Sequence, residues 1–155
     1  MGTSIPNYSV ATKSRDSSRI AAVLRRAPLV MMTVIFALIS FRYLSDPVGA
    51  AAAAGIGFTS PGGITIARVG FAAFPLSFAI LALASLISAR WRLAGLYMVL
   101  TVASVVIGVR VFGILIDHST ESARLLAPEA VLLALSVIAI RLELARRHGE
   151  GADVG

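Results

Sequence analysis

Residues 93–116 read LAGLYMVLTVASVVIGVRVFGILI, a stretch whose only charged side chain is Arg110. A helix rises about 1.5 Å per residue, so this stretch reaches across a bilayer's hydrocarbon core, which is roughly 30 Å thick. It must be a helix because lipid offers no water to satisfy exposed backbone N–H and C=O groups. The stretch therefore predicts a transmembrane helix.

Three further apolar stretches accompany it, at about 28–44, 60–89 and 123–144. Apolar residues make up 57% of the chain and charged residues 14%, whereas soluble domains average roughly 25% charged. A single soluble domain of 155 residues could not hide so much apolar surface in its own core. We expect an all-α fold, a four-helix transmembrane bundle, with Pro75 kinking the second helix.

The segment between the first two stretches carries helix-start signals. Asp46-Pro47 and Ser60-Pro61 each pair a capping side chain with a proline at the first helical position. We expect a short interfacial helix over 48–54, closed by Gly55. The predicted domain organisation is a disordered basic cytoplasmic tail and juxtamembrane segment at 1–27, a four-span membrane domain at 28–147 and a disordered C-terminal tail at 148–155.

Lys and Arg are distributed asymmetrically about the four stretches. Placing the N-terminus inside puts 10 of the 14 basic residues on the inner side, while the outer loops 46–61 and 117–123 hold none. Basic residues flanking spans concentrate on the cytoplasmic side. The pattern predicts a multi-pass protein with both termini in the cytoplasm.

Each predicted span carries one charge in its outer half, at a similar depth. Burying a charge at a helix centre costs about 2.5–3.5 kcal/mol on insertion scales, so these side chains should meet inside the bundle. Three arginines against one glutamate leave an excess of positive charge, which either outer-loop acids or an anionic or carbonyl-bearing ligand could balance. The predicted ligand-binding or buried charge network is Arg42, Arg68, Arg110, Asp117 and Glu129.

A purely structural role is the alternative for these charges. Arg42 lies close enough to the interface to extend its head group into water. The deeper charges could form an interhelical network that fixes packing, with Glu129 pairing either Arg110 or Arg68.

Several functional classes lack their residues in this sequence. There is no Cys, and both His residues, His118 and His148, lie outside the apolar stretches. No triad, phosphate-binding loop or metal-ligand spacing is present. We expect no catalytic site, no metal and no nucleic-acid partner; a quinone is the one cofactor candidate. The expected partners are membrane lipid and a membrane protein or a second copy of the chain.

Four short motifs resemble one known group. They are RYLSDP at 42–47, ARVG at 67–70, VRVFG at 109–113 with Asp117, and PEA at 128–130. The chain resembles, over residues 28–147, the DoxX-like family of small four-helix bacterial membrane proteins, in a branch of unknown function. The resemblance implies a location in the bacterial inner membrane, and some relatives are linked to sulfur or quinone redox chemistry.

Three functions follow as hypotheses. The first is a binding or accessory protein whose outer-half polar pocket holds a quinone, a lipid head group or a small anion. The second, implied by the resemblance alone, is a non-catalytic or quinone-linked subunit of a membrane oxidoreductase. The third is a small carrier, with a structural scaffold as a further alternative.

Overall fold

The computed structural model describes the backbone of residues 8–118 and 123–152, and the side chains of residues 18–116, 118 and 123–149. Every regular element in those ranges is helical. The elements are α1 (Tyr8–Ser45), α2 (Pro47–Ala52), α3 (Pro61–Arg68), the π-helix η1 (Val69–Ala73), α4 (Phe74–Ile87), α5 (Arg92–Asp117) and α7 (Leu126–Ala152).

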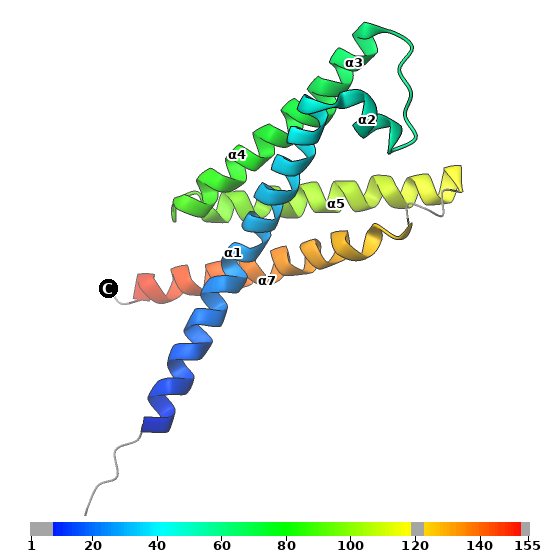
Figure 1. The fold of residues 1–155 in the computed structure, drawn as a ribbon. Helices are drawn as coiled ribbons and strands as arrows, with labels where there is room; N and C mark the ends of the chain where they lie inside the picture. Colours follow the sequence, from blue (N-terminus) through cyan, green and yellow to red (C-terminus); the bar gives the residue numbers. More distant parts are fainter. Residues whose placement is uncertain (1–7, 119–122, 153–155) are drawn as a thin grey trace, which may run out of the picture.

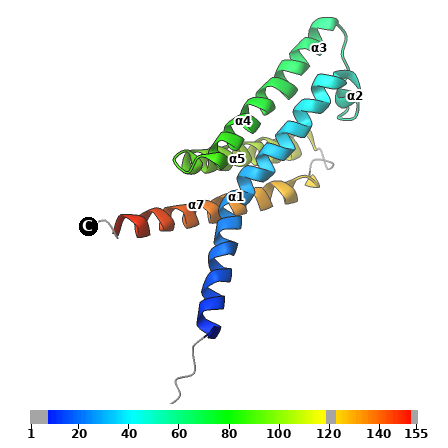
Figure 2. The same cartoon turned by 60° about the vertical axis from the view of Figure 1, so that its left-hand side comes forward.

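The long helices form two antiparallel pairs that cross each other. α1 lies along α3, η1 and α4, which run continuously in the opposite direction, and α5 lies along α7 (Figure 1). The turned view in Figure 2 shows the same crossing, with the α2–α3 end of one pair separating from the α5–α7 loop end of the other. The predicted all-helical class is confirmed. The predicted four-helix bundle is not confirmed, because the long helices form two crossed pairs.

Three helices are long and apolar enough to cross a membrane. They are Ser18–Ser45, Pro61–Ile87 and Arg92–Ile116, which match three of the four predicted spans. α7 falls short because its uninterrupted apolar stretch, between Glu129 and Arg141, is only 11 residues long. As a helix that stretch covers about 17 Å. A membrane protein is thus supported, whereas a fourth span is not shown.

The buried core lies where the two pairs cross. α1 contributes Leu29 and Met32, and α4, α5 and α7 contribute both small and large apolar side chains. Gly95 of α5 lies so close to α4 that an added Cβ would collide with the side chain of Ser85. The remaining core residues are Ala82, Leu96, Val99, Ala139 and Ile140.

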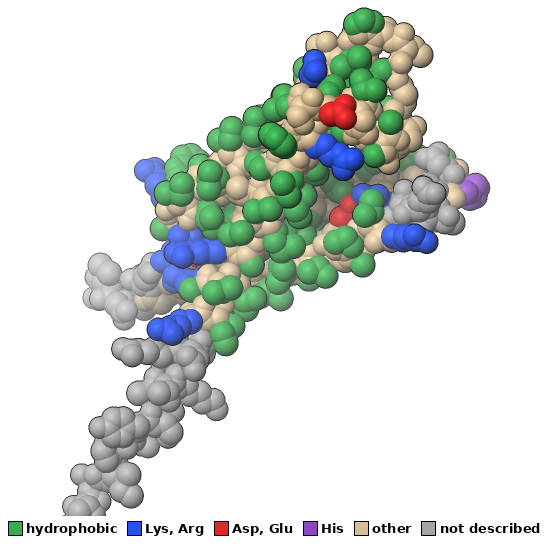
Figure 3. Space-filling model, in the orientation of Figure 1, with side chains coloured by type: hydrophobic (Ala, Val, Ile, Leu, Met, Phe, Trp, Pro, Cys, Tyr) green, Lys and Arg blue, Asp and Glu red, His purple; other side chains and the backbone are tan. Residues whose placement is uncertain are grey.

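Large apolar side chains face outward along the helices. Phe41 is 71% exposed, and Leu115 and Phe112 are 67% and 63% exposed. Hydrophobic side chains cover much of the visible face in Figure 3. So much apolar exposure is unfavourable in water and is compatible with lipid contact.

The predicted helix caps are confirmed. The Gly49 N–H donates to Asp46 Oδ1 at 2.9 Å, and the Gly63 N–H donates to Ser60 Oγ at 3.2 Å. The short helix α2 covers residues 47–52, slightly earlier than the predicted 48–54. Gly55 follows in the left-handed region with φ 74°.

The two ends of the chain are more helical than the sequence suggested. α1 starts at Tyr8 and passes through Pro28, and α7 continues to Ala152, into segments expected to be tails. Residues 19–27 are mostly Arg, Ala, Val and Leu, several of which are strong helix formers. The predicted disorder of residues 1–7 and 153–155 lies outside the described residues.

The kink expected at Pro75 stays a prediction, but the structure has a π-helical turn just before this proline. Proline has no N–H, so the carbonyl of Phe71 loses its usual helical donor. The backbone widens to π geometry over residues 69–73 and returns to α-helix at Phe74. Tyr43 of α1 packs against Phe71 within this turn, with ring centroids 5.0 Å apart.

Candidate ligand-binding site

A bidentate ion pair joins α5 to α7, in the half of these two helices that lies near their connecting loop. Arg110 Nε donates to Glu129 Oε1 at 2.9 Å and to Oε2 at 2.8 Å, and Arg110 Nη2 donates to Oε1 at 2.5 Å. The two side chains are 21% and 18% exposed. The antiparallel arrangement of α5 and α7 brings the two residues together across 19 positions of chain.

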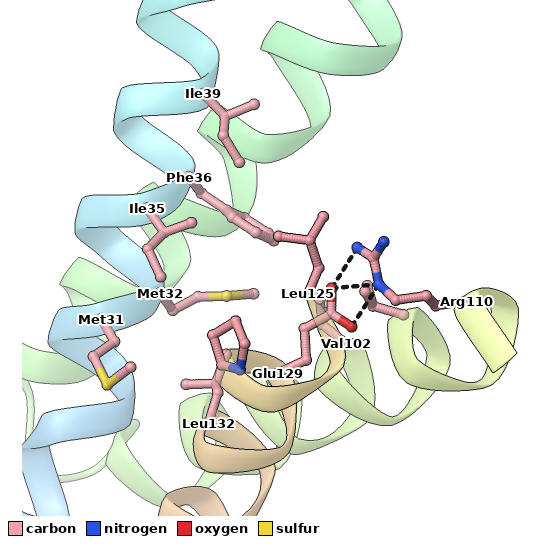
Figure 4. A pocket seen from close by; sticks show the side chains of 12 residues that line it. Met31, Met32, Ile35, Phe36, Ile39, Val102, Arg110, Leu125, Glu129 and Leu132 are labelled. Atoms are coloured by element: carbon pink, nitrogen blue, oxygen red, sulfur yellow. Dashed lines mark hydrogen bonds and ion pairs between the residues drawn. The ribbon is translucent and has the colours of Figure 1, made fainter. Parts of the chain in front are cut away.

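This ion pair forms part of the wall of a cavity of about 440 Å³ between α1, α5 and α7. Figure 4 shows the Met32 and Phe36 side chains extending from α1 toward the pair. Apart from Arg110 and Glu129, all of the lining residues are apolar: Met31, Met32, Ile35, Phe36, Ile39, Val102, Val106, Leu125, Pro128 and Leu132.

Exposed apolar side chains contribute to the boundary of the cavity. Ile35 and Ile39 of α1 are 42% and 37% exposed, and Leu125 before α7 is 51% exposed. The surface around the cavity is therefore apolar wherever these side chains reach it. An edge of this kind suits contact with hydrocarbon better than contact with water.

The chemistry of the wall follows from the charge balance. Arg110 and Glu129 cancel, so the cavity carries no net charge from its lining. A guanidinium has five N–H donors, and within the described part of the chain Arg110 bonds through Nε and Nη2 alone. The remaining N–H groups can donate to a neutral oxygen acceptor, such as a carbonyl.

Arg42 and Arg68 do not join this site. Both are exposed, neither lines the cavity, and neither forms an ion pair with any side chain that the structure describes. They belong to the pair that α1 forms with α3, η1 and α4. The α2–α3 end of this pair separates from the α5–α7 pair (Figures 1 and 2). The convergence of charges expected from their similar depth thus reduces to Arg110 and Glu129. The side chain of Asp117 lies outside the described residues.

A second charge cluster, at the opposite end of α5 and α7, surrounds Glu143. This carboxylate is completely buried. Oε2 lies 3.8 Å from Arg25 Nη1 and 3.8 Å from Arg92 Nη1, and Oε1 lies 2.7 Å from Arg146 Nη2 and 3.5 Å from Arg147 Nε. We call these five residues the Glu143 cluster; it ties α1, α5 and α7 together.

From the sequence, these arginines were interpreted only as signals of membrane orientation. The spacing of Glu143 to Arg146 and Arg147, three and four residues on, could have indicated ion pairs along one helix face. Nothing in the spacing pointed to Arg25 or Arg92, which come from other helices. Arg147 Nη2 also donates to the carbonyls of Ala89 and Arg90, at 3.3 and 3.4 Å, which ties the α4–α5 turn to the cluster.

Comparisons with protein families, curated proteins and solved structures found no match. The DoxX-like resemblance therefore stays a prediction. No group of three or more potential metal ligands occurs among the residues whose positions are described.

Proposed function

We propose that this chain is an integral membrane protein that binds a membrane-soluble ligand with a carbonyl-bearing head group, such as a quinone or an ester lipid. The proposed site is the cavity between α1, α5 and α7. The observation that carries the proposal is one ion pair, Arg110–Glu129, set in an otherwise apolar wall.

The size and lining of the cavity support this class of ligand. Pockets for small molecules typically measure about 300–1,000 Å³ and combine apolar walls with few polar groups; this one measures about 440 Å³. The unused N–H groups of Arg110 offer donors to a carbonyl oxygen, and Met32 and Phe36 offer contacts to a ring or an alkyl chain.

A small anion is a poorer fit to the same wall. Glu129 occupies the guanidinium with both carboxylate oxygens and supplies the compensating charge. An incoming anion would have to displace it or lie beside it, at a cost in like-charge repulsion. Arg42 and Arg68, which would have supplied the positive excess, lie elsewhere.

The proposal includes α7 as a fourth span. Two of the charges that interrupt its apolar stretch are paired: Glu129 with Arg110, and Glu143 with four arginines. Arg141 is exposed and forms no ion pair with the acids that the structure describes. Pairing lowers the cost of placing ionised groups in a bilayer. With four spans and the basic residues inside, both termini lie in the cytoplasm of a bacterium. Membership of the DoxX-like family, and hence the inner membrane, is part of this proposal.

The test is retention of ligand by the purified chain. The full-length protein is extracted in mild detergent, and native mass spectrometry and lipid extraction identify what remains bound. Ubiquinone and menaquinone are then added, and their binding is followed by the shift in thermal unfolding midpoint. Arg110→Ala is compared with Arg68→Ala, which removes the same charge from an exposed position outside the cavity.

We expect the wild type and Arg68→Ala to retain the same ligand and Arg110→Ala to lose it. A ligand at about one hundred times its Kd stabilises the fold by about 2.7 kcal/mol, which is readily measured. Equal retention by Arg110→Ala and the wild type would exclude the cavity as the site. If the wild type binds nothing and the pair only stabilises the fold, Arg110 and Glu129 are structural.

A further inference from the structure

The Glu143 cluster contains more positive charge than its carboxylate can neutralise. Arg25, Arg92 and Arg147 come from α1, α5 and α7 and share one negative charge. Leaving Arg146 aside, two positive charges are not balanced by any carboxylate that the structure describes. Charges removed from water need close partners of opposite sign.

Arg92 is the most deeply buried of these arginines. The residue is 8% exposed, and its Nε has no hydrogen-bond partner in the described part of the chain. Its Nη1 reaches Glu143 only at 3.8 Å, which is an ion-pair distance rather than a hydrogen bond. Glu143 alone therefore does not satisfy this guanidinium.

The surroundings of the cluster favour an anion at the membrane surface. α5 starts at Arg92 with no side-chain cap, so its first backbone N–H groups and the positive end of its dipole lie at this end of the molecule. Trp91, 61% exposed, provides an aromatic side chain of the kind enriched at bilayer interfaces. Figure 3 shows basic side chains gathered at the end where α4 turns into α5.

We propose that the Glu143 cluster binds the phosphate group of an anionic lipid in the cytoplasmic leaflet. Guanidinium groups bind phosphate oxygens in bidentate geometry. Glu143 holds the arginines in position from the buried side, while Arg25 and Arg147, with side chains 18% and 38% exposed, are reachable from outside. This site is separate from the cavity, which lies toward the other end of α5 and α7.

The test measures lipid-dependent stability of the full-length protein in mild detergent. Phosphatidylglycerol is compared with phosphatidylcholine, whose head group has no net charge, and with inorganic phosphate at equal concentration. Arg25→Gln removes one charge of the cluster. Arg141→Gln is the matched control, because Arg141 is an exposed basic residue of α7 that forms no ion pair with the described acids.

We expect phosphatidylglycerol to raise the unfolding midpoint of the wild type and of Arg141→Gln more than phosphatidylcholine does. Arg25→Gln should bind phosphatidylglycerol about five-fold more weakly, the factor that one basic residue at an anionic leaflet contributes. If Arg25→Gln does not fold, Arg147→Gln, which alters a more exposed member of the cluster, takes its place.

Glu143→Gln provides a second measurement. It removes the negative charge while keeping the side-chain size, so we expect lower stability in neutral detergent and a larger gain from phosphatidylglycerol than in the wild type. Equal stabilisation of the wild type by the two lipids, or an undiminished response in Arg25→Gln, would overturn the proposal. An equal response to inorganic phosphate would overturn the lipid as the source of the phosphate.

Discussion

At the scale of single residues, Arg110 and Glu129 show what sequence can and cannot predict about buried charge. Embedded charges of opposite sign in neighbouring spans predict an ion pair, because isolated charges are costly in lipid. Whether Glu129 meets Arg110 or Arg68 depends on how each helix is rotated and on which helices are adjacent. The sequence left both partners open, and the crossing of the pairs selects Arg110.

The stability of the fold should depend on both members of this pair together. Removing one partner of a fully buried ion pair costs about 3–5 kcal/mol of stability. Because these two side chains are about one-fifth exposed, we expect Arg110→Met or Glu129→Leu alone to lower the free energy of unfolding by about 1–3 kcal/mol. The double variant removes both charges and should recover most of the loss. Unfolding in detergent, followed by circular dichroism, measures the stability of the two single variants and the double variant. A double variant whose loss of stability equals the sum of the two single losses would contradict this coupling.

Gly95 and Gly108 lie on the same helix but should respond oppositely to substitution. A Cβ at Gly95 collides with Ser85 and comes within 3.1 Å of Leu29 Cδ2, whereas one at Gly108 meets nothing within 4 Å. Gly95→Ala should destabilise the chain by about 1–3 kcal/mol through overpacking. Gly108→Ala should be neutral or stabilising, because Ala is the better helix former. Thermal unfolding of the two variants checks the difference, and a stable Gly95→Ala would refute the close contact of α4 and α5.

At the scale of elements, the cap of α2 can be tested separately from the spans. Losing an N-cap side chain costs about 0.5–2 kcal/mol, and a helix of six residues has few other interactions. Asp46→Ala should therefore raise the rate of amide hydrogen exchange across α2. The effect should begin at the Gly49 N–H, which donates to Asp46 Oδ1. Asp46→Asn keeps an acceptor and serves as the control; unchanged exchange in Asp46→Ala would show that tertiary contacts alone hold this helix.

The elements were largely predictable, since their determinants are local. Caps at Asp46 and Ser60 and the long apolar stretches follow from neighbouring residues, and their helices lie close to the predicted bounds. The π-turn before Pro75 and the helical extension upstream of Pro28 were not predicted. Both depend on how a helix accommodates a proline, which the packing around it decides.

At the scale of the whole molecule, the crossing of the two pairs was beyond sequence reasoning. Crossing geometry depends on where small residues permit close approach, and here that place is Gly95 against Ser85. Similar depth in the bilayer does not mean proximity when helix ends separate. For that reason Arg42 and Arg68 were predicted in the site and lie outside it, while the contributions of Arg25 and Arg92 to the Glu143 cluster were missed.

The number of spans can be decided by labelling, because the chain has no native Cys. Gly57→Cys, between α2 and α3, and Gly149→Cys, near the end of α7, both lie where an added side chain meets nothing within 4 Å. If α7 crosses the membrane, an impermeant maleimide added to whole cells should reach position 57 and leave position 149 unlabelled until the cells are opened. Labelling of both positions in whole cells would mean three spans.

The apolar edge of the cavity, formed in part by Ile35, Ile39 and Leu125, has a consequence for how a ligand would arrive. A molecule approaching past such side chains comes sideways, out of the lipid tails. Its partition coefficient would then set occupancy more than its concentration in water does. Two compounds with identical head groups and different tail lengths should saturate the protein at the same mole fraction in the bilayer, although their aqueous doses differ widely.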